Sequence, residues 1–130
     1  MMKARQGFTL IELLIVVVVI GILAAIASAK FSAVRNRSFM AVTQTDMKNL
    51  VTKQEFYHSA SYTYAPTLEL AEAGLSPAVN VTLTHVSNTG WSAQGTHDGS
   101  ENLLCGVYIG TAPAAGGAPA TSPDVITCTE

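Results

Sequence analysis

The sequence predicts an α+β protein in which one long N-terminal helix packs on a small antiparallel sheet of three to four strands. Three observations lead to this fold class. A long apolar segment lies near the N-terminus, a segment without Pro or Gly follows it, and the C-terminal half alternates apolar and polar residues between turn signals. A chain of 130 residues has room for one small domain and a membrane anchor.

The first predicted element covers residues 8–29 and is called the stem below. Its only polar side chains are Thr9, Glu12 and Ser28. As a helix that rises about 1.5 Å per residue, the stem is about 33 Å long, which is enough to cross the hydrocarbon core of a bilayer. A cleaved secretory signal has a shorter apolar core of about 7–15 residues, so a retained transmembrane anchor is the better interpretation.

Charge is distributed unevenly along the chain. All seven Lys and Arg residues lie at or before Lys53, whereas residues 54–130 hold only acidic charges. This shortage of cations argues against direct nucleic-acid binding.

Because cations flank the stem on both sides, the positive-inside rule does not fix its orientation. The two cysteines, Cys105 and Cys128, predict a disulfide outside the reducing cytosol, and therefore an N-terminus on the inside.

A specific motif opens the stem. A short basic leader is followed by Gly7-Phe8-Thr9-Leu10-Ile11-Glu12, and the apolar run continues through Ala27. These first 27 residues closely resemble the prepilin signature of type IV pilins. The resemblance implies a leader peptide over residues 1–7, cleavage between Gly7 and Phe8 by a membrane-bound prepilin peptidase, and N-methylation of Phe8. It also implies a precursor in the inner membrane and a mature subunit in an extracellular pilus.

Two roles are open for Glu12, the one charged side chain within the stem. Thr9 and Glu12 have the spacing of a capping box, which satisfies backbone donors at a helix start. Alternatively, the carboxylate needs a cationic partner, because a charge at the bilayer centre costs about 2.5–3.5 kcal/mol. The resemblance implies that this partner is the new α-amine of Phe8 in a neighbouring copy, which makes Glu12 an assembly residue. The two roles are compatible.

One position departs from the family pattern. The pilins that this sequence resembles commonly have a proline where this chain has Ala29. Without that ring, the helix is expected to continue through Ala29 and Lys30 with no kink imposed by proline. Gly21 remains a point where the helix is weakened, by up to about 1 kcal/mol.

Residues 30–58 contain no Pro or Gly and are predicted to continue the helix. Five of its apolar side chains fall on about half of the helical wheel, so this segment is expected to pack against the sheet. They are Phe39, Val42, Met47, Leu50 and Val51. Arg35 and Arg37 are expected to be solvated or near lipid phosphates, or else to meet an acidic head of another copy.

Residues 59–130 form the predicted globular head. It begins with a connector that contains one short helix, residues 67–73, closed by Gly74. Strands with short turns then predict an antiparallel meander. The strands are predicted over residues 79–84, 91–97, 103–109 and 125–128.

The segment of residues 111–123 consists entirely of Ala, Gly, Pro, Ser and Thr. Such a composition cannot build a core, so the segment is expected to lie on the surface. The resemblance implies that it belongs to a loop bounded by the Cys105–Cys128 disulfide, which shapes the exterior of the filament.

No catalytic residue, metal site or cofactor is predicted. His58, His85 and His97 lack the spacing of metal ligands, and the chain has neither a phosphate-binding glycine loop nor a nucleophile elbow. Three function classes remain. The first is a type IV pilin that forms a helical homo-oligomer with the pilus assembly machinery. The others are a pseudopilin of a type II secretion system and a membrane-anchored binding module that does not polymerise.

Overall fold

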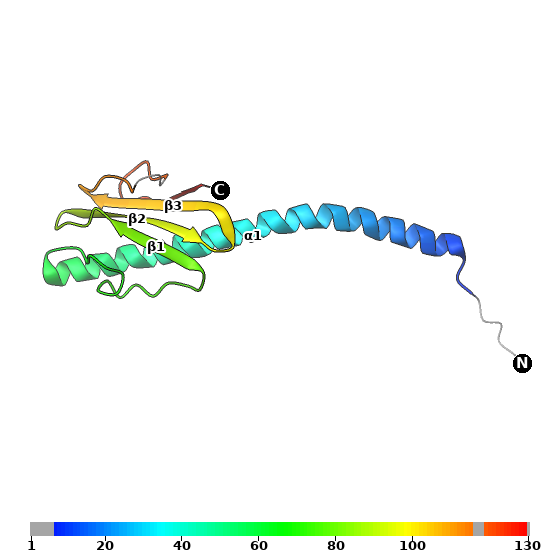
Figure 1. Cartoon of the computed structure of the whole chain (residues 1–130), viewed down its shortest axis with the longest axis horizontal. Helices are drawn as coiled ribbons and strands as arrows, with labels where there is room; N and C mark the ends of the chain where they lie inside the picture. Colours follow the sequence, from blue (N-terminus) through cyan, green and yellow to red (C-terminus); the bar gives the residue numbers. More distant parts are fainter. Residues whose placement is uncertain (1–6, 116–118, 130) are drawn as a thin grey trace, which may run out of the picture. The chain divides into compact units, whose positions relative to one another are not determined.

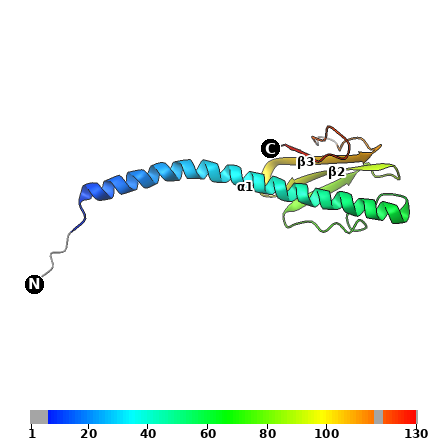
Figure 2. The same cartoon turned by 180° about the vertical axis from the view of Figure 1, so that it is seen from behind.

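The computed structural model describes residues 7–115 and 119–129. In this part of the chain, a single helix, α1 (Leu10–Ser61), is followed by four strands: β1 (Val79–Thr84), β2 (Gly90–His97), β3 (Ser100–Gly110) and β4 (Thr127–Thr129). The strands form one antiparallel sheet in the order β1-β2-β3-β4 (Figures 1 and 2). The predicted α+β fold, with one long helix and a small antiparallel meander, is confirmed.

The chain divides into two compact units, of which the first ends at Arg35. The second, Asn36–Glu130, is called the globular unit below. Helix α1 contributes residues to both units and passes through Gly21 and Ala29 without interruption. Within the globular unit, the helix lies along one face of the sheet (Figures 1 and 2).

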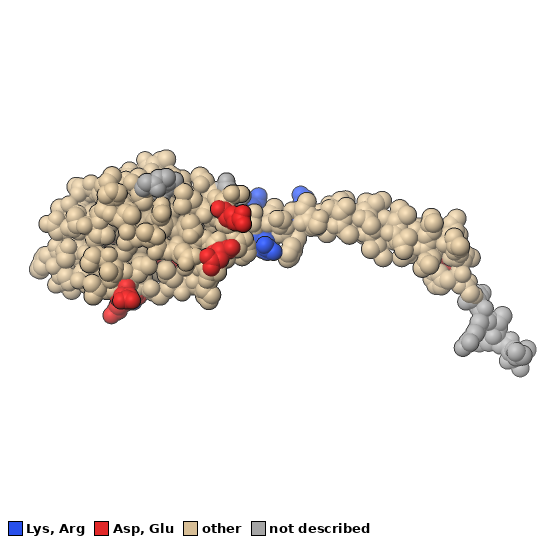
Figure 3. Space-filling view, in the orientation of Figure 1, with Lys and Arg blue, Asp and Glu red and all other residues tan. Residues whose placement is uncertain are grey.

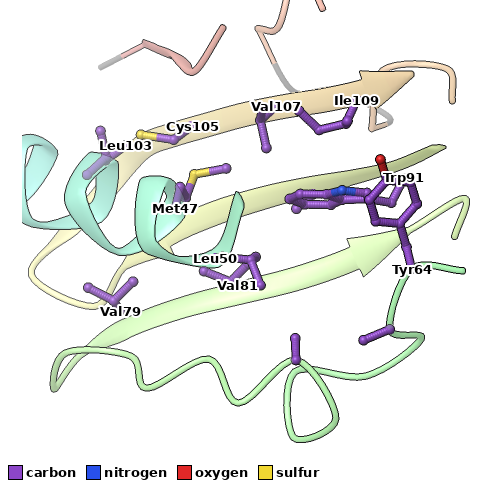
Figure 4. Packing of buried hydrophobic residues seen from close by; sticks show 13 residues of the cluster. Met47, Leu50, Tyr64, Val79, Val81, Trp91, Leu103, Cys105, Val107 and Ile109 are labelled. Carbon is purple, nitrogen blue, oxygen red and sulfur yellow. The ribbon is translucent and has the colours of Figure 1, made fainter. Parts of the chain in front are cut away.

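The core of the globular unit lies between α1 and the sheet (Figure 4). Met47 and Leu50 of the helix and Trp91 of β2 are fully buried. Strand residues that pack with them are Val79, Val81, Ala93, Leu103, Cys105, Val107 and Ile109. Gly95 of β2 permits the helix to approach the sheet, because a Cβ there would lie 2.9 Å from Met47 Sδ.

Helix α1 ends at Ser61, later than the predicted end at His58. The Tyr62 N–H donates to the His58 carbonyl at 2.8 Å, and Tyr62 takes the left-handed conformation with φ 57°. This hydrogen bond and backbone angle are typical of a helix end at which glycine is the usual residue. The prediction missed the true end because a tyrosine provides it.

The short helix predicted over residues 67–73 is wrong, since the structure has only a turn there. The Thr67 carbonyl accepts the Ala71 N–H at 3.2 Å. Glu72, rather than Gly74, takes the left-handed conformation (φ 52°). Because the residue that ends the turn comes earlier than predicted, there is no room for a second helical turn.

The strand predictions are correct in the strand centres and differ at the ends. β2 begins at Gly90 and β3 extends over Ser100–Gly110, beyond the predicted residues 103–109. β4 covers Thr127–Thr129 rather than residues 125–128. The shift of β4 follows from its pairing, in which Cys128 lies directly opposite Cys105.

The surface location predicted for residues 111–123 is wrong for two side chains. Ala112 and Ala115 are buried. The N–H groups of Thr111 and Ala112 donate to the carbonyls of Thr89 and Ile109, at 3.2 and 3.4 Å. These bonds hold the start of the segment against the end of the sheet, where small methyl side chains fit.

Candidate assembly site

The N-terminal end of the stem is exposed and begins outside the helix. Gly7, Phe8 and Thr9 precede α1, and the Phe8 side chain is 84% exposed. A Cβ at Gly7 would meet no atom within 4 Å. The peptide bond predicted to be cleaved therefore lies in exposed, non-helical backbone. Apart from Gly7, the predicted leader of residues 1–7 lies outside the described residues.

Thr9 and Glu12 form a complete capping box. Glu12 Oε2 accepts hydrogen bonds from the Thr9 N–H at 2.9 Å and from the Thr9 hydroxyl at 2.8 Å. The Glu12 N–H donates in return to Thr9 Oγ1 at 3.3 Å. Both partners satisfy backbone donors that a helix start leaves open, and the acid lies where the helix dipole is favourable. These bonds engage Oε2, so Oε1 retains capacity to accept a further hydrogen bond.

The apolar side chains of the stem are exposed all around the helix. The large ones between Leu10 and Ile26 are each 48–82% exposed. Figure 3 shows this part of α1 covered mostly by uncharged side chains. Among the described residues, α1 is the one helix long and apolar enough to cross a membrane. A helix of this kind needs lipid or other protein around it, because water does not solvate such a surface favourably.

Two buried polar side chains of α1, which the sequence analysis missed, hold the connector to the helix. Gln54 is fully buried; its Nε2 donates to the Ala65 carbonyl at 2.9 Å, and its Oε1 accepts the Ala65 N–H at 2.8 Å. Asp46 accepts the N–H and the hydroxyl of Ser76, at 2.6 and 3.0 Å. Both lie one helical turn from Leu50, so their spacing placed them on the core face.

The structure joins Cys105 and Cys128 in a disulfide, with their Cα atoms 4.0 Å apart. Cys105 is fully buried in β3, and Cys128 packs against the same core from β4. Strand β4 is only three residues long, and the bridge adds a covalent link to its pairing with β3.

In the part of the head that the structure describes, the titratable side chains do not form a ligand cluster. Within residues 7–115 and 119–129, no group of three His, Cys, Asp or Glu side chains could hold a metal ion. His85 Nδ1 lies 3.2 Å from Ser92 Oγ. Ser92 is fully buried, however, and its hydroxyl also donates to the Thr84 carbonyl at 3.1 Å. This contact therefore ties the end of β1 to β2.

Tyr64 has the one clearly shifted ionisation in the described part of the globular unit. Burial raises its pKa above the ordinary value, because the phenolate is disfavoured away from water. The Tyr64 hydroxyl also donates to Glu55 Oε1 at 3.1 Å, and the negative charges of Glu55 and Asp124 raise the pKa further. The ring stacks on His58 with centroids 4.4 Å apart and lies beside Trp91 (Figure 4).

Comparisons with known proteins agree with the motif and the fold. The family profile of the prokaryotic N-terminal methylation motif matches residues 2–28. The chain is 39% identical over 88 residues to the type IV wide pilus major component PilA4 of Thermus thermophilus, which covers 66% of this chain and 67% of that protein. It is 43% identical over 73 residues to the type IV major pilin protein PilA of Myxococcus xanthus, which covers 56% of this chain and 32% of that protein.

A secretion protein is also similar. The type II secretion system core protein G of Pseudomonas aeruginosa is 31% identical over 71 residues, which covers 55% of this chain and 50% of that protein.

The long apolar helix, the capped acid at its start and the antiparallel sheet define a pilin-like protein. The chain belongs to the type IV pilin family, as the resemblance of its first residues predicted. It spans about a third of the Myxococcus pilin and about two thirds of the Thermus pilin.

Proposed function

We propose that this protein is a structural subunit of a type IV pilus. The stems of many copies pack together along the filament, and their heads form its outside. The observation that carries the proposal is the stem, an exposed apolar helix that contains a single acid. Contacts between unlike surfaces of successive copies do not close into a ring, so they extend into a helical filament.

Maturation precedes assembly in this proposal. The stem anchors the precursor in the inner membrane, a prepilin peptidase cleaves between Gly7 and Phe8, and the new amine of Phe8 is then N-methylated. The exposed, non-helical backbone at this bond supports the assignment. Cleavage before the stem leaves the anchor on the mature protein. It also removes Lys3 and Arg5, so the mature chain is more acidic.

Glu12 then pairs with the Phe8 α-amine of a neighbouring copy. Packing of stems removes water from the carboxylate, and a desolvated charge without a partner costs several kcal/mol. The amine created by cleavage supplies the positive charge. The capping box supports this role, because it holds the carboxylate at a fixed position and leaves Oε1 able to accept the neighbour's hydrogen bond.

Surface filaments sheared from cells that express the chain test the proposal. They should contain this protein as the main subunit, and mass spectrometry should give an N-terminal Phe8 with one N-methyl group. Filaments built from chains that still begin at Met1 would contradict the maturation step. Cells with processed protein but without any filament that contains it would contradict the pilus assignment.

The similarity to the secretion core protein favours a second candidate, a pseudopilin of a type II secretion system. Deletion of the gene separates the two. A pilin should be present in sheared surface filaments, and its loss should leave protein secretion unchanged. A pseudopilin should show the opposite result on both measurements.

A further inference from the structure

We propose that Asp98 and Gly99 form a modification site, at which the backbone isomerises from aspartate to isoaspartate without an enzyme. Two side chains of the sheet, Asn80 and His97, slow this reaction in the folded chain. All four residues lie in the globular unit, and the inference does not depend on assembly into a filament.

The pair Asp98-Gly99 has the composition that favours this reaction. The Gly99 backbone nitrogen attacks Asp98 Cγ, an N–Cγ bond forms, and the carboxyl OH and the amide proton leave together as water. The resulting succinimide takes up one water molecule at either of its carbonyls, which gives aspartate or isoaspartate. Glycine has no side chain that hinders the attack. The other aspartates of the chain, Asp46 and Asp124, each precede a residue with a large side chain.

The pair lies in the short turn that joins β2 to β3. His97 and Ser100 are paired across this turn, and Asp98 and Gly99 between them are exposed. Figures 1 and 2 show the turn beside α1. Water, which the second step of the reaction consumes, therefore reaches the site.

The packing of α1 on the turn favours glycine at position 99. A Cβ at Gly99 would lie 2.7 Å from Phe39 Cε2 and Cζ, and 3.2 Å from His97 Nδ1. The Phe39 ring also stacks on the His97 ring, with their centroids 4.2 Å apart. A larger residue at this position would have to displace the Phe39 ring. The fold therefore selects, at this turn, the residue that makes the preceding aspartate reactive.

Two hydrogen bonds hold the reacting groups on other partners. Asn80 Nδ2 donates to Asp98 Oδ1 at 2.6 Å, and the charge of the carboxylate strengthens this bond. The Gly99 N–H donates to His97 Nδ1 at 3.0 Å, so this ring nitrogen carries no proton. The Asp98 N–H also donates to the Ala78 carbonyl, at 2.9 Å. Attack brings Asp98 Cγ within bonding distance of the Gly99 nitrogen and removes its proton, and the first two bonds oppose these changes.

Isomerisation lengthens the turn. In isoaspartate the main chain passes through Cβ and Cγ, which adds one methylene group between Asp98 and Gly99. The longer turn does not fit both the pairing of His97 with Ser100 and the close contact of Gly99 with Phe39. The isomerised chain should therefore unfold at a lower temperature than the unmodified chain.

Ageing of the purified full chain in detergent at neutral pH tests the site. Peptide mapping identifies isoaspartate by its unchanged mass and altered elution, whereas deamidation of an asparagine raises the mass. Isoaspartate should form at Asp98 in urea, and at least about tenfold more slowly in the folded chain, because two hydrogen bonds restrain the reacting groups there. Asp98→Glu, which cannot form the succinimide, should remove the signal. No isoaspartate at Asp98 in urea, or equal rates in the two states, would overturn the inference.

Variants test the two positioning side chains separately. In the folded chain, Asn80→Ala should raise the rate about tenfold, and His97→Phe, which keeps a ring against Phe39, about fivefold. Thr82→Ala, at an exposed position of β1, is the control and should leave the rate unchanged. Thermal unfolding of each variant shows that the fold is kept, and in urea all the chains should react at one rate. Unchanged rates in the folded Asn80→Ala and His97→Phe chains, or an equal rise in Thr82→Ala, would overturn the inference.

Discussion

At the residue scale, single polar side chains attach the connector to helix α1. Replacement of Gln54 by Leu keeps a similar volume but leaves the buried N–H and carbonyl of Ala65 without their partners. Each unsatisfied group costs about 1–3 kcal/mol, so the free energy of unfolding should fall by about 2–4 kcal/mol. Chemical denaturation of the full chain in detergent measures it. Asn49→Leu, at an exposed position of the same helix, should change it by less than about 0.5 kcal/mol. Equal losses from both variants would contradict the assignment.

Tyr64 predicts a pH dependence of stability. Its pKa is raised in the folded chain, so the folded state holds the phenol proton more tightly than the unfolded state. This contribution is fully present below the unfolded pKa of about 10 and is lost as the pH rises through the folded pKa. As the pH rises above about 10, the free energy of unfolding should therefore fall less for Tyr64→Phe than for the unmodified chain. Tyr62→Phe, at a tyrosine that is 83% exposed, should behave like the unmodified chain. If the free energy of unfolding depends on pH in the same way for Tyr64→Phe and the unmodified chain, the assigned role of Tyr64 is wrong.

The residues that could be predicted are those whose role is local in the sequence. Thr9 and Glu12 are three residues apart, and their capping bonds follow from that spacing. Gln54 and Asp46 bind backbone groups far along the chain, and a polar residue does not indicate which distant group it binds. Their positions on the core face were nevertheless visible, since a polar side chain in an apolar stripe must find a buried partner.

At the element scale, periodicity identified the elements better than their ends. The alternation in β1 and the absence of Pro and Gly from residues 30–58 of α1 gave the correct types of structure. The ends depend on single left-handed residues, and here Tyr62 and Glu72 adopt that conformation where glycine is the usual signal. Propensity alone could not locate them, because the tertiary contacts of the connector determine where the backbone reverses.

The left-handed glycine at the end of β3 gives a testable prediction. Gly110 has φ +64°, and a Cβ there would collide with the Thr89 carbonyl. Gly110→Ala should therefore lower the free energy of unfolding by at least about 2 kcal/mol. Gly74→Ala is the matched control, because a Cβ at Gly74 meets nothing within 4 Å and its φ is not positive. It should be neutral or slightly stabilising, and a larger loss at Gly74 than at Gly110 would contradict the account.

The disulfide gives a second prediction for the sheet. Cys105→Ser with Cys128→Ser should lower the free energy of unfolding by about 3 kcal/mol, because the loop between them becomes unconstrained in the unfolded chain. Thermal unfolding measures the loss, and reduction of the unmodified protein should reproduce most of it. A melting temperature that neither treatment changes would show that β4 is held by its other contacts.

At the scale of the whole molecule, the order of the elements and the family followed from the sequence. The apolar stem, the motif at its start and the change to alternating residues each point to the same architecture. The buried polar residues of α1 and the burial of Ala112 and Ala115 arise from folding of the globular unit. The backbone groups that these polar residues bind, and the side chains that cover the two alanines, depend on which distant surfaces meet, so no local pattern predicted these contacts.

The central claim is that the charge of Glu12, and not its capping bonds alone, drives assembly. Glu12→Gln is the most direct measurement, because glutamine can complete the capping box but carries no charge. Filaments sheared from cells with equal amounts of membrane protein should fall at least about tenfold for Glu12→Gln, as for Glu12→Ala. Thr9→Val, which weakens the capping box and keeps the acid, should stay within about threefold of the unmodified chain. Normal filament yield from Glu12→Gln would contradict the account.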